Sequence, residues 1–296
     1  MKHVTVLLTE AVGALCLKED SVVVDCTFGS GGHAKEILSI LGKGGTYIGI
    51  DADETAFIDK REEIESYKAT THLVVGNFRS IVEILDGLHI TNVDAMLADL
   101  GWRTEQFMDG KKGFSFSDDS TLLMTYGDPK DYTFTAHTIV NEWEEENIAD
   151  VIYGYGEERG SRRIAKAIVD ARENGAIDTS LQLAEIVKNA LPSGFRNPRI
   201  NPATKTFQAL RIAVNDELGA IESLILNGFT RLTSGGRFAI ISFHSIEDRI
   251  VKQLFKQYIQ DKTGEKVTKK PITPEYEEIK RNPRARSAKL RIIEKI

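Results

Sequence analysis

A glycine-rich loop that joins a short apolar strand to a helix is the segment of this sequence best suited to chemistry. A β-branched run ends at Asp25, and Gly29, Gly31 and Gly32 follow before a helical pattern begins at His33. Glycines let a backbone turn sharply and approach a ligand closely, and the first N–H groups of a helix have no partner within it. The loop is therefore predicted to bind a small polar ligand through Asp25 and the three glycines.

Two cofactors suit such a loop. The pattern Gly29-x-Gly31-x-x-Ala34 also satisfies the relaxed dinucleotide fingerprint. A carboxylate at Asp25 favours S-adenosylmethionine, because it repels a pyrophosphate and attracts ammonium and sulfonium charges. Asp51 ends the next strand and suits the ribose hydroxyls of either cofactor. The methyl donor is favoured, and a dinucleotide or a turn without a ligand remain alternatives.

The strands that position these residues are expected to lie side by side in a parallel sheet, where ligands bind at the carboxyl ends. Asp51, Phe78 and Asp99 then share one rim. Asp99 closes an apolar run and precedes Leu100. It is predicted to stand where the transferred group leaves the cofactor pocket, and capping of a nearby turn is the alternative role.

The order of elements predicts a doubly wound α/β sheet interrupted by helices. Strands are expected at 21–25, 46–51, 71–75, 93–99, 236–243 and 288–294. Sheet-covering helices are expected at 33–42, 53–65, 78–88, 205–228 and 245–259, and other helices at 141–153, 157–173 and 180–190. Residues 260–283 are polar enough for a mobile loop. These patterns predict a cofactor domain at 1–105 plus 209–296 and an inserted helical domain at 106–208.

Composition indicates a soluble globular protein with a full core. The chain has 296 residues, 41% of them hydrophobic, and a net charge of −6, which argues against a uniformly basic surface. No run suits a membrane span or a secretory signal, so a cytoplasmic protein is expected. Two cysteines are too few for a disulfide framework, and no cluster has convincing metal-ligand spacing, so no metal is predicted.

Basic residues gather locally despite the negative total. Residues 266–296 carry ten Lys and Arg against four Glu. Arg159 and Arg163, and Arg284 and Arg286 in the tail, are candidates for phosphate contact. Around the first pair, a solvated helix face with internal ion pairs is equally compatible with the pattern.

Two further polar groups have alternative structural roles. Arg211 and Asn215 form a stripe at helical spacing, which suits either contact with RNA or a network on the helix surface. His244 follows a predicted strand and could hold an unstacked base. Ser245 is predicted to cap the next helix, with Asp248 at the capping-box position.

Seven motifs, taken together, resemble one known family. They lie at residues 3–10, 27–33, 113–116, 155–159, 201–211, 241–249 and 282–287. The chain closely resembles the RsmH (MraW) family of bacterial small-subunit ribosomal RNA cytosine-N4 methyltransferases.

The resemblance implies a class I (Rossmann-like) S-adenosylmethionine-dependent methyltransferase sheet with an inserted all-helical domain. It implies methylation of one cytosine in the decoding region of 16S rRNA within the small ribosomal subunit. A homodimer is compatible with the sequence. By motif position, the family's cofactor contacts fall on Gly31, Gly32, His33, Asp51, Phe78, Asp99 and Gln106.

The implied reaction is in-line attack of the cytosine amino nitrogen on a sulfonium methyl. Because the nitrogen lone pair is delocalised into the ring, hydrogen-bond acceptors around the amino group are required. Asp99 and backbone carbonyls near Leu100 are the candidates. His244 or Phe243 is expected to hold the base outside its stack.

Two departures from the family pattern bear on activity. Trp102-Arg103-Thr104 replaces a small hydroxyl pair, and Trp102 is predicted to offer the RNA a stacking surface instead. Leu123 stands where the family has an acid. Two alternative functions therefore remain. One is an assembly factor without catalysis, and the other is a methyltransferase for DNA or another RNA.

Overall fold

The computed structural model describes residues 4–101, 112–116, 119–192 and 201–296. It divides into two compact units, one formed by Met1–Arg103 with Leu218–Ile296 and the other by Thr104–Glu217. We call them the sheet unit and the helical unit. The helical unit extends beyond the predicted boundary at 208, because α11 (Thr204–Asn215) packs against α8 (Glu145–Gly156) of the same unit.

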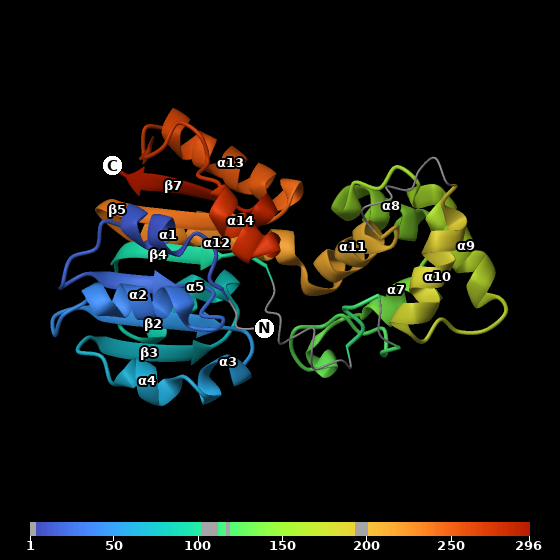
Figure 1. The fold of residues 1–296 in the computed structure, drawn as a ribbon, viewed down its shortest axis with the longest axis horizontal. Helices are drawn as coiled ribbons and strands as arrows, with labels where there is room; N and C mark the ends of the chain where they lie inside the picture. Colours follow the sequence, from blue (N-terminus) through green and yellow to red (C-terminus); the bar gives the residue numbers. More distant parts are fainter. Residues whose placement is uncertain (1–3, 102–111, 117–118, 193–200) are drawn as a thin grey trace. The chain divides into compact units, whose positions relative to one another are not determined.

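The sheet unit is built on seven strands in the order β3-β2-β1-β4-β5-β7-β6 (Figure 1). They are β1 (Val22–Asp25), β2 (Thr46–Asp51), β3 (Thr70–Val75), β4 (Val93–Asp99), β5 (Leu232–Ser242), β6 (Gly264–Lys266) and β7 (Lys289–Lys295). Strands β1 to β5 are parallel, and β7 runs antiparallel to both β5 and β6. The strand order changes direction at β1, beside β4, where open α/β sheets bind their ligands. The predicted α/β fold class is confirmed.

Alternate residues of the central strands fill two cores, one on each face of the sheet. Val23 and Ala95 belong to one core, while Val24 and Met96 belong to the other. The first core is covered by α1 (Leu8–Ala14) and α2 (Gly32–Ile40), and the second by α5 (Ile81–Gly87), α12 (Glu217–Arg231) and α13 (Ser245–Gln260). This is the near-continuous apolar strand pattern expected of a parallel sheet buried on both faces.

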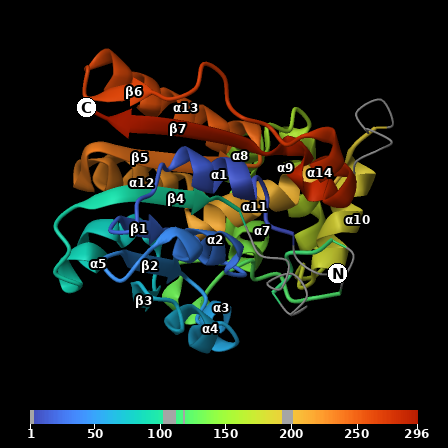
Figure 2. The ribbon, with the colours of Figure 1, turned by 60° about the vertical axis from the view of Figure 1, so that its left-hand side comes forward.

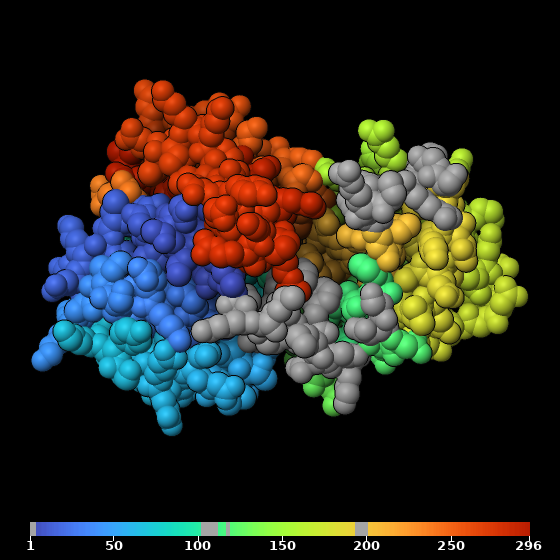
Figure 3. Space-filling model, in the orientation of Figure 1, coloured from blue at the N-terminus to red at the C-terminus, as the bar shows by residue number. Residues whose placement is uncertain are grey.

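The N-terminal segment packs against the C-terminal part of the chain. The Leu7 backbone N–H donates to Glu278 Oε1 at 2.8 Å, and Asn282 donates through Nδ2 to the Val4 carbonyl at 3.0 Å. Glu278 lies in α14 (Tyr276–Arg281), and Figure 3 shows the C-terminal segment in red against the N-terminal segment in blue. This contact fixes the residues just before α1.

Several elements differ from those predicted. The single helix expected at 205–228 is two helices, α11 and α12, because Asp216 adopts a left-handed φ of 46° between them. The helix expected at 53–65 is broken into α3 (Thr55–Ile58) and α4 (Arg61–Glu65). The segment predicted as a mobile loop at 260–283 contains β6 and α14.

The helical unit has its own core. Its helices are α7 (Ala136–Glu142), α8, α9 (Ser161–Arg172), α10 (Ser180–Ala190) and α11 (Figures 1 and 2). Ile139, Ile152 and Ile168 are fully buried in it. Thr135 and Thr179 begin α7 and α10 as capping boxes. Across the described ranges, no helix is both long and apolar enough to cross a bilayer.

Candidate functional site

The glycine loop after β1 is held open by left-handed backbone conformations. Gly29 has a φ of 57° and Gly31 a φ of 75°, a region that glycine enters without steric cost. Gly31 is the N-cap of α2. A Cβ atom at Gly32 would lie 1.8 Å from Oγ1 of Thr5, so the N-terminal segment leaves room for glycine alone. The loop therefore presents backbone, rather than side chains, at the carboxyl end of β1.

Asp25 stabilises this loop through hydrogen bonds. Its side chain is fully buried; Oδ1 accepts from the Thr27 N–H at 3.2 Å and Oδ2 accepts from the Tyr47 hydroxyl at 3.0 Å. Burial raises the pKa of Asp25 to about 7. The predicted direct attraction between Asp25 and a cationic ligand is corrected: its side chain is buried and bonded to Thr27 and Tyr47 within the sheet unit, so the residue stabilises the loop without reaching its surface.

Asp51 joins the glycine loop to the end of β2. Its Oδ2 accepts from the Gly29 N–H at 2.9 Å, and its Oδ1 accepts from the Asp53 N–H at 2.9 Å. An ionised carboxylate has about four lone-pair sites. Asp51 thus retains acceptor capacity for ribose hydroxyls while it fixes the loop.

Asp99 ends β4 beside the start of α2. Its Oδ2 lies 3.9 Å from Nδ1 of His33, whose side chain is buried. Its backbone N–H donates to Thr27 Oγ1 at 2.6 Å. Burial, together with the nearby charges of Asp25 and Glu247, raises the pKa of Asp99 well above its ordinary value. The neighbouring Leu100 is buried, and its N–H is bonded to the Ile241 carbonyl at 2.9 Å.

These residues fit S-adenosylmethionine. Oδ1 of Asp99 is buried and accepts no hydrogen bond from the described residues, a costly state unless a ligand donor completes it. Asp51 adds a second acceptor on the same sheet edge, and the donor carries hydroxyl and amino groups suited to both. Phe78 begins the short 3₁₀ turn after β3 and is half-buried on this rim.

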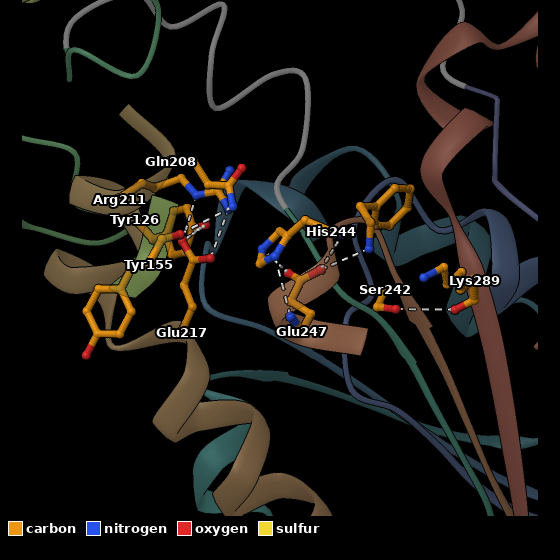
Figure 4. Close-up of polar contacts among 10 residues, drawn as sticks. Tyr126, Tyr155, Gln208, Arg211, Glu217, Ser242, His244, Glu247 and Lys289 are labelled. Atoms are coloured by element: carbon orange, nitrogen blue, oxygen red, sulfur yellow. Dashed lines mark hydrogen bonds and ion pairs between the residues drawn. The ribbon is translucent and has the colours of Figure 1, made fainter. Parts of the chain in front are cut away.

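His244 caps α13, which corrects the predicted assignment to Ser245 and Asp248. Its Nδ1 accepts from the Glu247 N–H at 3.4 Å, and Glu247 Oε2 accepts from the His244 N–H at 3.3 Å (Figure 4). Asp248 instead binds Lys289 at 3.0 Å and Arg291 at 2.7 Å. The capping box lies one residue earlier than predicted, because the strand before it ends at Ser242. The predicted contact between His244 and a flipped base stays a prediction.

Arg211 and Asn215 form the structural network that was the alternative to RNA contact. Arg211 forms a bidentate ion pair with Glu217, in which Nε and Nη2 donate to the two carboxylate oxygens at 2.7 and 2.9 Å. Glu217 also accepts from the Tyr126 hydroxyl at 2.8 Å (Figure 4). Asn215 donates to the carbonyls of Met124 and Arg211. Arg211 and Asn215 are each 8% exposed. The prediction that these two residues bind RNA is corrected, because their polar groups are bonded inside the helical unit.

The other basic candidates lie on the surface. Arg159, just before α9, and Arg163, in the first turn of α9, are exposed, as are Arg284 and Arg286 after α14. Each pair belongs to a different unit, and the geometry leaves both accessible to phosphate. Trp102 and Gln106 fall outside the described residues.

Sequence reasoning missed Thr5, Thr27 and Tyr47. Tyr47 shares a sheet face with Gly49, which pairs in register with Asp25. The alternation of side chains along β2 can be predicted from the sequence, but the register of β1 and β2 that brings Tyr47 to Asp25 cannot. Thr5 lies in one of the motifs, yet its contact with Gly32 links two segments that no local pattern connects.

Comparison with known proteins gives a single family. A profile described as the MraW methylase family matches residues 1–296. Proteins named Ribosomal RNA small subunit methyltransferase H from Brevibacillus brevis and Paenibacillus sp. are each 42% identical to this chain. The first alignment covers 99% of this chain and 98% of the relative, and the second 100% and 99%. The protein of that name from Clostridioides difficile is 41% identical over 99% of both chains.

Proposed function

Because this chain belongs to the MraW methylase family, we propose that it methylates N4 of a specific cytosine in the decoding region of 16S rRNA. The substrate is the small ribosomal subunit, and the enzyme acts in the cytoplasm. The match to relatives named Ribosomal RNA small subunit methyltransferase H, along nearly their full length, is the observation that carries this proposal.

S-adenosylmethionine is the methyl donor, and the loop after β1 with the rim beside it holds it. When bound, it supplies a methyl carbon made electrophilic by the sulfonium. Gly29, Gly31 and Gly32 allow close backbone approach, Asp51 accepts from the ribose, and Phe78 packs against the nucleoside. His33 and Gln106 complete the contacts. Asp25 holds the loop in place through Thr27 and Tyr47.

Asp99 and the Leu100 carbonyl act on the target amino group. By accepting hydrogen bonds from the cytosine NH₂, they favour the localised lone pair and orient it for attack. The Asp99 carboxylate must be ionised to serve only as an acceptor. His244 or Phe243 holds the base outside its stack.

The exposed arginines bind the RNA backbone. Arg159 and Arg163 act from the helical unit, and Arg284 and Arg286 from the sheet unit, through phosphate contacts that fix orientation rather than sequence. Trp102 adds a stacking surface. A homodimer stays a prediction.

An assembly factor that binds the donor without turnover is the second candidate. Leu123 favours it, because Leu replaces an acid of the family pattern at that position. A methyltransferase for DNA or another RNA is the third.

One experiment separates the three candidates. Labelled S-adenosylmethionine and small subunits from a methylation-deficient strain are incubated with the protein, and the digested RNA is analysed by mass spectrometry. N4-methylcytidine in the decoding region is expected. Donor binding without product supports the assembly factor, and faster methylation of naked DNA than of subunits supports the third candidate.

A further inference from the structure

A cavity of about 300 Å³ lies at the β6 edge of the sheet unit, away from the glycine loop. Its walls come from α13, β7, and β6 with the loop that follows it, elements that lie side by side in Figures 1 and 2. This volume is at the lower end of the range for small-molecule sites, about the size of one nucleotide.

Cationic side chains reach the cavity from several segments. Lys252 and Lys256 lie one turn apart on α13, Lys266 ends β6, and Lys270 lies in the following loop. Residues four apart on a helix share a face. All four lysines are exposed, so their ammonium groups surround an opening rather than a buried core.

The charges at the cavity are mostly uncompensated. Arg291 also lines it but is paired with Asp248, which accepts from its Nε at 2.7 Å. Lys266 donates to the Lys269 carbonyl, which shapes the loop without removing its charge. Within residues 201–296, Lys252, Lys256 and Lys270 form no ion pair, and none of the residues lining the cavity is acidic.

The floor of the cavity is apolar. It consists of Phe255 and Ile292, which are 5% and 3% exposed, together with Ile259 and Pro271. A site for an inorganic anion needs cations but no such floor. A phosphate that carries an apolar or aromatic group uses both parts, which is the chemistry of a nucleotide.

We infer that this cavity binds one nucleotide of the RNA strand at a distance from the target cytosine. Lys252, Lys256 and Lys270 contact its phosphate and the phosphates beside it, and the base or sugar rests on Phe255 and Ile259. The inference builds on the proposed function, since it assigns a second anchoring point for the same RNA substrate.

The test removes the three charges together. The variant Lys252→Gln/Lys256→Gln/Lys270→Gln is compared with Lys18→Gln/Lys43→Gln/Lys68→Gln, which has the same net charge. The control lysines are exposed and precede β1, β2 and β3, at the ends of these strands opposite the glycine loop. Both variants are assayed as full-length proteins with small subunits and with a mixed-sequence single-stranded RNA oligonucleotide.

The cavity variant is expected to raise KM for subunits about tenfold and leave kcat within about twofold. Its slope of log affinity against log salt for the oligonucleotide should fall by about 2, since each lost phosphate contact removes about 0.7. Equal KM values and equal slopes for the cavity and control variants would overturn the inference.

Two further measurements address the cavity itself. Thr268→Trp adds bulk to its wall without changing charge and is expected to weaken oligonucleotide binding; unchanged binding would contradict a nucleotide inside the cavity. Polyphosphate of matched charge should bind the wild-type protein less tightly than the oligonucleotide, because it has no base or sugar to contact the apolar floor. Equal affinity of the wild-type protein for the two ligands would overturn the nucleotide assignment. If wild-type protein yields no N4-methylcytidine, the proposed function fails, while the oligonucleotide measurements still decide the cavity.

Discussion

Asp51 accepts a hydrogen bond from the Gly29 N–H at 2.9 Å, so the carboxylate that ends β2 also fixes the glycine loop that follows β1. A residue in this position does two things at once: it sets the loop conformation and offers acceptor capacity to a ligand. Substitution of Asp51 is therefore expected to weaken cofactor binding more than it lowers the stability of the fold.

Asp51→Ala is expected to weaken S-adenosylmethionine binding about 100-fold, because both the loop anchor and the ribose acceptor are lost. Isothermal titration calorimetry measures the dissociation constant. The control is Asp53→Ala, since the Asp53 side chain accepts from Thr55 in the turn after β2 rather than from the glycine loop residue Gly29, and this variant should change affinity less than threefold. Equal effects at the two positions would contradict the role of Asp51.

Asp99→Ala is expected to lower kcat about 100-fold at saturating donor and subunits, in line with the loss of one preorganised electrostatic contact. Because burial raises the pKa of Asp99, the wild-type rate should rise with pH as the carboxylate ionises. The rate of Asp99→Asn should not show that rise. The exposed Asp86→Asn serves as control, and a retained pH dependence in Asp99→Asn would assign the ionisation to another group.

The stability of the sheet unit should fall as pH rises through the ionisation of Asp25. The folded-state pKa is about 7, above the ordinary value of 3.8, so between these two values the native state holds a proton that the unfolded state has released. The stabilisation is complete below about pH 4 and is lost as pH approaches and passes 7, at about 1.4 kcal/mol for each pH unit.

Asp25→Asn tests this, because an amide preserves the shape of the protonated carboxyl and can donate to the Tyr47 oxygen. The free energy of unfolding is measured in urea at pH 5 and pH 7. The wild-type value should fall by about 2 kcal/mol more than that of the variant over this interval. Parallel pH dependence of the two proteins would show that Asp25 ionises normally.

Arg211→Ala is expected to destabilise the helical unit by about 3–5 kcal/mol, because it leaves the largely buried Glu217 carboxylate without its cationic partner. Hydrogen exchange across α11, read by mass spectrometry, reports the local stability. Arg163→Ala, on the exposed side of α9, should change stability by less than about 0.5 kcal/mol. If Arg211→Ala lowered the stability less than Arg163→Ala, the structural role of Arg211 would be contradicted and RNA binding would again be its expected role.

Arg159→Gln/Arg163→Gln should weaken RNA binding and reduce its salt slope by about 0.7 for each phosphate contact removed. The matched control is Lys130→Gln/Lys188→Gln, two exposed lysines of the same unit. Binding of a single-stranded oligonucleotide at several salt concentrations measures both quantities. Identical slopes for the two variants would remove α9 from the interface.

The sequence predicted β2 and β4 to the residue, because each is a run of apolar residues bounded by polar turns. It also placed Asp51 and Asp99 at strand ends. It could not predict the side chains that face them: Tyr47 reaches Asp25 only through the register of β1 and β2. The same limit applies to Asp216, whose left-handed backbone breaks a helix that periodicity alone continues.

The roles of charged residues were the least predictable. Asp25 stands in a ligand-binding motif and Arg211 on a polar stripe, yet Asp25 is bonded to Tyr47 of the neighbouring strand and Arg211 to Glu217 at the start of the next helix. Because both side chains are buried, these residues stabilise the structure instead of contacting a ligand. Residues that stay exposed in the structure, such as Arg159 and Arg284, kept their predicted roles as proposals.

The insertion of the helical unit also affects how the chain is made. Strand β4 ends at Asp99, but its neighbour β5 begins only at Leu232. At about 5–20 residues per second, the ribosome needs roughly 7 to 26 seconds to synthesise the intervening chain. During that time one edge of the nascent four-stranded sheet has no partner, and an unpaired edge invites pairing with other chains. A helical unit that folds early, as its local contacts favour, shortens the effective distance between the two strands and limits that exposure.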